Sequence, residues 1–225
     1  MYYLIDEKFK IVFGWSTKCG CTHVKLLFYF LKNNIFKKPL HTPADYGSLP
    51  NDIENYIVIL IIRNPYQRII SGFLNKYGVD GQYLYLWKHD TITFSKFVDE
   101  LSKNNWSMID KHHFTQQTSE KFDENKLLKC KELKIYDLNN IDYSFIESIF
   151  NKKIPDHILT FKAGHERKKY ANTYENYVYD LEIKIYFNYN VDIKYFYNEE
   201  IKTKIYNFYE KDFIYYKNNG FNYYI

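Results

Sequence analysis

Alternating apolar and polar blocks divide the first third of the chain into two similar stretches. Residues 10–15 (KIVFGW) are a short apolar block that predicts a strand, and residues 16–22 (STKCGCT) form a polar turn after it. Beyond that turn, apolar positions from Val24 to Leu31 predict a buried helix that ends near Asn33 and Asn34. The first stretch therefore reads strand, turn and helix.

The second stretch repeats this order after a connection. Residues 35–55 predict a loop that holds at most a short strand, and residues 56–62 (YIVILII) are typical of a strand buried on both faces. A polar turn, residues 63–66 (RNPY), follows, and Pro65 suits the first turn of a helix. The apolar stripe of that helix is Ile69, Ile70, Phe73 and Leu74. Two successive strand–turn–helix units predict a parallel sheet.

The rest of the chain adds helices and one more strand. Helices are predicted at 93–104, 142–151, 173–188 and 198–217, and a short strand at 133–136. There is no internal repeat and no low-complexity linker, and 225 residues suit one unit that buries its own core. We therefore expect one α/β domain over residues 1–225, with a central parallel sheet flanked by helices.

Composition removes several classes of function. The 31 Lys and Arg residues against 27 Asp and Glu give a net charge of +4, too weak and dispersed to predict nucleic-acid binding. Cys19, Cys21 and Cys130 do not form a disulfide framework, and no second ligand pair at suitable spacing predicts zinc. The longest apolar run, at 56–62, is far shorter than the roughly 20 residues of a membrane span. Because the N-terminus also lacks a signal pattern, we expect no membrane span and a soluble, cytoplasmic protein.

Arginine is rare here, although lysine is abundant. Only three of the 31 basic residues are arginines, namely Arg63, Arg68 and Arg167. We attribute the excess of lysine to an AT-rich coding sequence. Arginine is retained where a planar guanidinium must grip an oxyanion, because an ammonium group cannot replace it there. The three arginines are therefore candidate anion ligands.

The first polar turn has the features of an anion site. A turn between a buried strand and a helix presents backbone N–H groups and the positive end of the helix dipole. The side chains of Lys18 and Thr22 add to it, but the Walker A spacing fails: five residues rather than four separate Gly14 from Gly20, and Cys21 stands where lysine is required. The turn then either cradles a phosphate or sulfate group or is an ordinary helix N-terminus. An ATPase or kinase of the P-loop type is disfavoured.

The second polar turn offers a second site of the same kind. Arg63 stands at the end of a buried strand, and Ser71 follows eight residues later, within the next helix. A guanidinium and a hydroxyl in these places are able to hold a phosphate group together.

With both turns in view, the chain resembles a known family. Residues 16–22 and residues 63–71 (RNPYQRIIS) look like the paired signature of sulfotransferases that use 3′-phosphoadenosine 5′-phosphosulfate, most similar to the Golgi carbohydrate sulfotransferases. The similarity continues in residues 72–77 (GFLNKY), 111–117 (KHHFTQQ) and 205–213 (IYNFYEKDF), so it covers nearly the whole chain, although only the first two blocks are specific.

The resemblance implies a P-loop-NTPase-like α/β fold and a role for each matching residue. Lys18 and the backbone of residues 19–23 would hold the 5′-phosphosulfate, and Arg63 with Ser71 would hold the 3′-phosphate. The implied donor-binding residues are Thr17, Lys18, Cys19, Gly20, Cys21, Thr22, His23, Arg63, Ser71, Arg167 and Lys168. The family usually has Asp where Asn64 stands, and Thr or Ser where Cys21 stands, but neither departure removes an anion ligand. Its Golgi members carry an N-terminal membrane anchor, which we do not find here, so a secretory location does not carry over.

Sulfuryl transfer also needs a group that neutralises the leaving oxygen and a base for the acceptor hydroxyl. Lys18 is the candidate for the first task. For the second, His41 is the first choice, because its place before Arg63 resembles that of the base in heparan-type 2-O-sulfotransferases. His113, in the block at 111–117, is the second choice. Either histidine is equally well read as a surface or hydrogen-bonded residue.

The third arginine lies in a late basic segment, residues 164–169 (GHERKK). In sulfotransferases a late basic loop folds over the nucleotide, so the resemblance makes Arg167 and Lys168 candidates for the 3′-phosphate or for closing the site. The alternative is a solvated cluster of charges.

The resulting hypothesis is a sulfotransferase that acts from 3′-phosphoadenosine 5′-phosphosulfate on a hydroxyl, most simply one of a glycan, and releases adenosine 3′,5′-bisphosphate. No metal is expected, because lysine, arginine and helix ends neutralise the donor. Two alternatives remain: a nucleotide-dependent kinase on a related fold, and a non-catalytic module that binds a nucleotide or glycan. The acceptor and the oligomeric state stay open.

Overall fold

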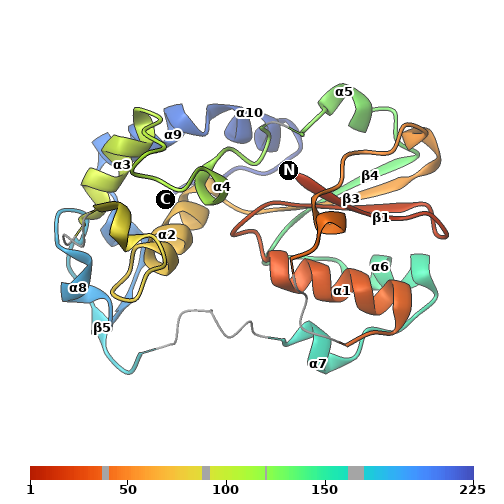
Figure 1. Cartoon of the computed structure of the whole chain (residues 1–225), viewed down its shortest axis with the longest axis horizontal. Coiled ribbons are helices and arrows are strands. Elements are labelled where there is room, and N and C mark those ends of the chain that lie inside the picture. The colour runs from red at the N-terminus through yellow and green to blue at the C-terminus, as the bar shows by residue number, and fades with distance from the viewer. Residues whose placement is uncertain (37–40, 88–91, 120, 162–169) are drawn as a thin grey trace. The chain divides into compact units, whose positions relative to one another are not determined.

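The computed structural model describes residues 1–36, 41–87, 92–119, 121–161 and 170–225, and the chain divides into two compact units (Figure 1). The sheet unit comprises Met1–Arg63 and Gln117–Gly164, and the helical unit comprises Asn64–Gln116 and His165–Ile225. Each unit is built from two separate stretches of chain. The expectation of one domain over residues 1–225 stays a prediction.

A four-stranded mixed sheet forms the centre of the sheet unit. Its strands are β1 (Tyr2–Asp6), β2 (Ile11–Trp15), β3 (Ile57–Ile62) and β4 (Glu132–Asp137), in that spatial order. β2, β3 and β4 are parallel, as expected, whereas β1 pairs antiparallel with β2 and was not predicted. Only four residues separate β1 from β2, and so short a connection allows only an antiparallel hairpin. The sheet is therefore parallel-rich rather than wholly parallel.

Alternation along the strands directs one set of side chains toward the helices of this unit. Ile11, Phe13 and Trp15 of β2 and Ile59 and Ile61 of β3 share a core with apolar residues of three helices. These helices are α1 (Cys21–Asn33), α6 (Tyr143–Phe150) and α7 (Asp156–Leu159), which lie along one face of the sheet in Figure 1. The polar turn between β2 and α1 is thus held at both ends by a buried element.

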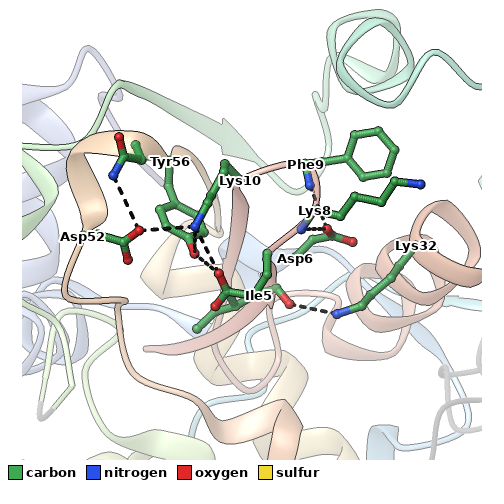
Figure 2. Close-up of polar contacts among 10 residues, drawn as sticks. Ile5, Asp6, Lys8, Phe9, Lys10, Lys32, Asp52 and Tyr56 are labelled. Carbon is green, nitrogen blue, oxygen red and sulfur yellow. Dashed lines mark hydrogen bonds and ion pairs between the residues drawn. The ribbon is translucent and has the colours of Figure 1, made fainter.

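A polar network fastens the β1–β2 hairpin to the start of β3 (Figure 2). The Lys10 ammonium lies 3.2 Å from the carboxylates of Glu7 and Asp52 and 3.1 Å from the hydroxyl of Tyr56. Within the hairpin, the Asp6 carboxylate accepts from two backbone N–H groups at 2.9 Å, which shapes the turn. These contacts involve the N-terminal ends of β2 and β3, away from the polar turns that follow those strands.

Short helices complete the sheet unit, and the helical unit holds most of the others. In the sheet unit these are η1 (Pro43–Tyr46), η2 (Ile53–Asn55) and α5 (Glu124–Leu127). The helical unit contains α2 (Pro65–Lys76), η3 (Leu84–Trp87), α3 (Phe94–Ser102), α4 (Lys111–Phe114), α8 (Ile183–Tyr186), η4 (Ile193–Phe196), α9 (Glu199–Phe208), α10 (Glu210–Asn218) and a two-stranded sheet of β5 (Thr173–Tyr174) and β6 (Asn190–Val191). Within the described ranges, no helix is both long enough and apolar enough to cross a membrane.

The helical unit has its own, strongly aromatic core. Phe73 of α2 and Tyr77, the residue after α2, pack against Phe97 of α3, with ring centroids 5.1 and 5.2 Å from the Phe97 ring. α9 lies against α3 and adds Ile201 and Ile205 to the same cluster. Much of the aromatic excess of the sequence is therefore core.

Two predicted helices are wrong in extent. The segment at 173–188 forms β5 and the four-residue α8 instead of one long helix, because its backbone bonds to other segments: Val178 N–H donates to the Tyr195 carbonyl and Ile183 N–H to that of Ile92. The predicted helix at 198–217 is broken at Tyr209, whose non-helical backbone (φ −101°, ψ 20°) ends α9 and begins α10.

Candidate functional site

The polar turn between β2 and α1 is shaped by two residues with left-handed backbone. Lys18 has φ 64° and Gly20 has φ 67°, and between them the Cys19 N–H donates to the Ser16 carbonyl at 3.2 Å. Left-handed residues in a tight turn direct successive N–H groups toward one side and so form an anion-binding concavity. Gly20 is the N-cap of α1, and no acidic residue lies in the first turn of that helix. The turn therefore offers an anion the positive end of a 13-residue helix.

Gly20 is required here by space as well as by backbone conformation. A Cβ at this position would lie 2.4 Å from Cδ1 of Leu138, the residue after β4. β4 runs parallel to β3, so the carboxyl ends of β2, β3 and β4 meet at one edge of the sheet. Leu138 thus closes one side of the turn.

Arg63, directly after β3, contacts this first turn. Its Nη1 donates to the carbonyl of Lys18 at 2.9 Å, which places the two cationic residues of the two polar turns together. A guanidinium carries five N–H donors in a planar fork, so it is able to serve several acceptors at once. The sequence predicts two separate anion sites, whereas in the structure the two turns are in contact.

Gln117 connects the two turns from a third segment of chain. Gln117 is fully buried. Its Oε1 accepts from the Cys19 thiol at 2.7 Å and from the Arg63 backbone N–H at 3.2 Å. Its Nε2 donates to the Arg63 carbonyl at 2.9 Å. The sequence predicts no role for Gln117, and the one signal that marks it is its place in the block at 111–117. A glutamine suits this place because it is both donor and acceptor.

The other predicted donor ligands are spread over the chain. Thr17 and Cys19 are buried in the turn, and Cys21, Thr22 and His23 are half-buried in the first turn of α1. His23 Nε2 lies 2.9 Å from the hydroxyl of Tyr143 in α6, so the imidazole also ties α1 to that helix. The rest of the predicted set is Ser71, which lies in α2 of the helical unit, and Arg167 and Lys168, which lie outside the described residues.

His41 sits in a polar cluster beside α1. Its Nδ1 lies 3.1 Å from the Lys25 ammonium and 2.9 Å from the Tyr46 hydroxyl. The Lys25 side chain is buried and forms an ion pair of 3.5 Å with the equally buried Asp45. Because an ammonium has no lone pair, Nδ1 must accept from Lys25, and the ring proton then resides on Nε2. In this arrangement Nε2 of His41 is a donor.

His113 has the opposite arrangement, in the helical unit. Its Nδ1 contacts the carboxylate of Asp110, which accepts, so Nδ1 carries the proton and Nε2 keeps its lone pair. Burial lowers the pKa of His113 below its ordinary value, and the hydrogen bond to Asp110 opposes this only in part. Burial alone would raise the pKa of Asp110, but contact with His113 holds it below its ordinary value. Asp110 is therefore ionised at neutral pH, and His113 is neutral.

Arg68, which the sequence makes a candidate anion ligand, contacts the backbone and a ring in this region. It is buried, its Nη2 donates to the His113 carbonyl at 3.3 Å, and its guanidinium lies 5.8 Å from the ring centroid of Tyr209. The Tyr209 hydroxyl donates to the Phe114 carbonyl at 2.6 Å. Together they satisfy carbonyls at the C-terminus of α4. These contacts give the Arg68 guanidinium a structural role beside α4.

Comparison with known proteins places these features in a family. The model of the sulfotransferase family matches residues 1–219. Carbohydrate sulfotransferase 11 of Danio rerio is 21% identical over 90 residues, an alignment that covers 33% of this chain and 26% of that protein. The match therefore spans about a quarter of the length of this relative. No solved structure matches the chain. Because the family match extends over nearly all of its 225 residues, the chain belongs to the sulfotransferase family.

Proposed function

We propose that this chain transfers a sulfuryl group from 3′-phosphoadenosine 5′-phosphosulfate to a hydroxyl of a glycan. The observation that carries the proposal is the hydrogen bond from the Arg63 guanidinium to the Lys18 carbonyl, which brings a cationic side chain to the anion-binding turn of a sulfotransferase-family chain. The glycan acceptor rests on the word carbohydrate in the name of the zebrafish relative. The P-loop-NTPase-like description of the fold belongs to the same proposal.

The residues of the first turn fit the charged end of this donor. The left-handed backbone at Lys18 and Gly20 favours a concavity of N–H groups, and the N-terminus of α1 adds positive potential. We assign the 5′-phosphosulfate to Lys18 and the backbone of residues 19–23. A metal is not part of the proposal, because these groups already carry compensating charge.

The second phosphate needs a separate set of ligands. We assign the 3′-phosphate to the guanidinium of Arg63 and the hydroxyl of Ser71, with Arg167 and Lys168 as further candidates. The retention of arginine at 63 supports this choice, since a planar fork grips a phosphate through two N–H groups.

In the transfer, the acceptor oxygen forms a bond to sulfur as the bond between sulfur and the bridging oxygen breaks. The donor supplies an activated sulfuryl group, whose departure leaves adenosine 3′,5′-bisphosphate. Lys18 neutralises the charge that develops on the bridging oxygen, and the turn holds its N–H groups in place before the reaction. A base must also take the proton of the acceptor hydroxyl.

Of the two histidines proposed as that base, the geometry favours His113. A base needs an unprotonated ring nitrogen, which His113 offers at Nε2, whereas the Lys25 ammonium forces the ring proton of His41 onto Nε2. His41 therefore becomes the second candidate.

A ligand-binding experiment tests the donor site. Adenosine 3′,5′-bisphosphate should raise the melting temperature of the full chain, because a ligand bound only by the folded state stabilises it. ATP with Mg²⁺ is the comparison. A shift with ATP and Mg²⁺ alone would favour a kinase, and no shift with either ligand would overturn the proposed donor site.

An activity experiment tests the transfer itself. The full chain is incubated with ³⁵S-labelled donor and unsulfated polysaccharides such as chondroitin and heparosan, and label in the polymer is counted. Label in at least one polysaccharide supports the proposal. Binding of the bisphosphate without any transfer would instead identify a non-catalytic nucleotide-binding protein.

A further inference from the structure

The carboxylate of Asp110 has two partners on the same short helix. As the N-cap of α4 it accepts from the backbone N–H of His113 at 3.1 Å, and it also contacts the His113 imidazole at Nδ1. The same oxygen, Oδ2, makes both contacts. One oxygen thus fixes the backbone and the ring of a single residue.

Neighbouring elements of the helical unit hold this pair from two sides. The Asp110 N–H donates at 2.8 Å to the hydroxyl of Tyr77, a fully buried residue after α2, while Arg68 donates to the His113 carbonyl. α4 also lies close to α2, because a Cβ at Gly72 would stand 2.6 Å from the Phe114 ring. Both residues remain partly accessible, with 16% of the Asp110 and 17% of the His113 side chain exposed. The imidazole is therefore held firmly without being sealed from solvent.

Asp123 caps a helix of the same length as α4 and provides a comparison for Asp110. Asp123 is the N-cap of the four-residue helix α5, and its side chain accepts from the Lys126 N–H at 2.9 Å. Asp110 caps a helix of the same length in the same way, but it also contacts an imidazole. Capping explains the aspartate at 123, whereas at 110 it leaves the contact with the ring unexplained.

We infer that Asp110 is a positioning residue, which holds His113 in the tautomer protonated at Nδ1 so that Nε2 takes the proton of the acceptor hydroxyl. This inference rests on the proposed function and names the residue that orients its base. The proton passes from the acceptor oxygen to Nε2, and the carboxylate stabilises the imidazolium that forms.

Other ionisable side chains also face His113. They come from α2, from the segment before η3 and from α4 itself: Arg68, Lys76, Tyr83 and His112. Burial, together with the positive charge of Lys76 and that of His112 when it is protonated, lowers the pKa of His113 below the usual value of about 6.5. Activity should therefore rise with pH through a midpoint below that value, as Nε2 loses its proton.

Asp110→Asn tests the inference with little change of shape. The amide oxygen still caps α4, since asparagine caps a helix as well as aspartate does. An amide oxygen in the place of Oδ2 also still accepts from Nδ1, so the tautomer is kept, but the negative charge that stabilises the imidazolium is lost. We expect kcat to fall by about tenfold, with the KM for the labelled donor and the thermal shift by the bisphosphate unchanged. The acid limb of the pH profile should move to lower pH, because the carboxylate no longer raises the pKa of His113.

Asp123→Asn is the matched control, since it removes the same charge from the same position of a helix of equal length. It should keep kcat within about twofold. A loss of kcat as large as that of Asp110→Asn would show a general effect of charge or capping and would overturn the inference. So would full activity of Asp110→Asn, or a loss that appears only in the KM for the donor.

A measurement on the unmodified protein does not depend on any variant folding. ¹⁵N chemical shifts of the imidazole should show Nδ1 protonated and Nε2 unprotonated in His113 at pH 7. The opposite tautomer in the wild-type chain would overturn the inference even if transfer is observed. A wild-type chain with the expected tautomer that binds the bisphosphate but sulfates no polysaccharide would overturn the proposed function, and the base role with it.

Discussion

Gly20 shows how one residue limits the shape of the donor turn. Its φ of +67° lies in the left-handed region, which costs other residues about 1–2 kcal/mol. Leu138 occupies the space that a side chain would need. These two constraints are independent, and a second glycine of the chain allows them to be separated.

Gly20→Ala should therefore destabilise the protein more than Gly220→Ala does. Gly220 also has a positive φ, +87°, but nothing lies within 4 Å of a Cβ at that position. We expect a cost of about 1–2 kcal/mol for strain alone at Gly220 and a further 1–3 kcal/mol, roughly, for the clash at Gly20. Urea unfolding of the two variants measures the difference, and equal costs would show that Leu138 moves aside freely.

Substitution of Lys18 should lower mainly kcat, whereas substitution of Arg63 should lower mainly the affinity for the bisphosphate. Lys18→Ala removes the charge assigned to the bridging oxygen, so kcat should fall by about 100-fold or more while the affinity for the bisphosphate falls only modestly. Arg63→Lys keeps a charge but loses the planar fork, so the Kd for the bisphosphate should rise about tenfold or more. Calorimetric titration and the ³⁵S assay separate the two effects. Full affinity in Arg63→Lys would contradict the role given to the guanidinium.

At the scale of elements, a buried ion pair joins α1 to the loop that carries η1. Lys25 of α1 and Asp45 of η1 are 1% and 0% exposed, and Asp45 also accepts from the Tyr29 hydroxyl and the Thr42 N–H, each at 2.8 Å. The Trp15 Nε1–H of β2 donates to the Asp45 carbonyl at 3.0 Å. The pair thus fixes the segment around His41, and this structural task accounts for the contact between Lys25 and the imidazole.

Lys25→Met should destabilise the protein strongly, because it leaves the Asp45 carboxylate buried without its cation. The expected cost is about 3–5 kcal/mol, measured by urea unfolding. Lys153→Met serves as the control, since the Lys153 side chain is 92% exposed in its pair with Glu147 and should cost less than about 1 kcal/mol. Equal costs for the two variants would mean that Asp45 is stabilised without Lys25.

The hairpin network around Lys10 should make stability depend on pH in acid. Hydrogen bonds from Tyr56 and Lys10 lower the pKa of Glu7, and the hydrogen bond from Lys10 lowers that of Asp52. A carboxylate with a lowered pKa stabilises the fold above its ordinary value, here 4.5 and 3.8, and this contribution disappears as pH falls. The wild type should therefore lose more stability between pH 7 and pH 3 than Lys10→Met does. Because the network is exposed, the difference in urea midpoint between the two proteins should be small and should shrink in high salt. A larger loss of stability in Lys10→Met than in the wild type would contradict this account.

At the scale of the whole molecule, each unit has a separate core. One core lies between the sheet and α1, α6 and α7, and the other is the aromatic cluster of the helical unit. Both units are discontinuous in sequence, so neither is a single segment that limited proteolysis would release intact. A substitution that weakens the packing of one core should lower the local stability of that unit first.

Leu101→Ala tests this separation from within α3. Leu101 is 1% exposed in the aromatic cluster, so the cavity should cost about 2–5 kcal/mol. Hydrogen exchange should accelerate in α2, α3 and α9 more than in β2 and β3. Leu27→Ala, at an equally buried position of α1, should show the reverse pattern. Uniform acceleration in both variants would mean that the two cores open together.

Much of the fold could be predicted from the sequence because its signals are local. The apolar runs of β2 and β3, the polar turns after them and the Pro65 start of α2 all depend on residues within a few positions of one another. The short helices α4 and α5 and the true extent of 173–188 could not be predicted in this way. Four residues are too few for a helical period, and the backbone at 178 and 183 bonds to distant segments.

In the candidate site too, the residue types could be predicted from the sequence, whereas the contacts between distant residues could not. By itself the sequence determined which residue types stand at the strand ends, and so the choice of Lys18 and Arg63 and the resemblance to sulfotransferases. Only the tertiary structure decided that Arg63 reaches the carbonyl of Lys18, that Gln117 joins the two turns and that Asp110 contacts Nδ1 of His113. The reason is physical: the chemistry of a side chain is a property of its residue type, whereas the protonation of an imidazole nitrogen depends on which atoms the fold places beside it.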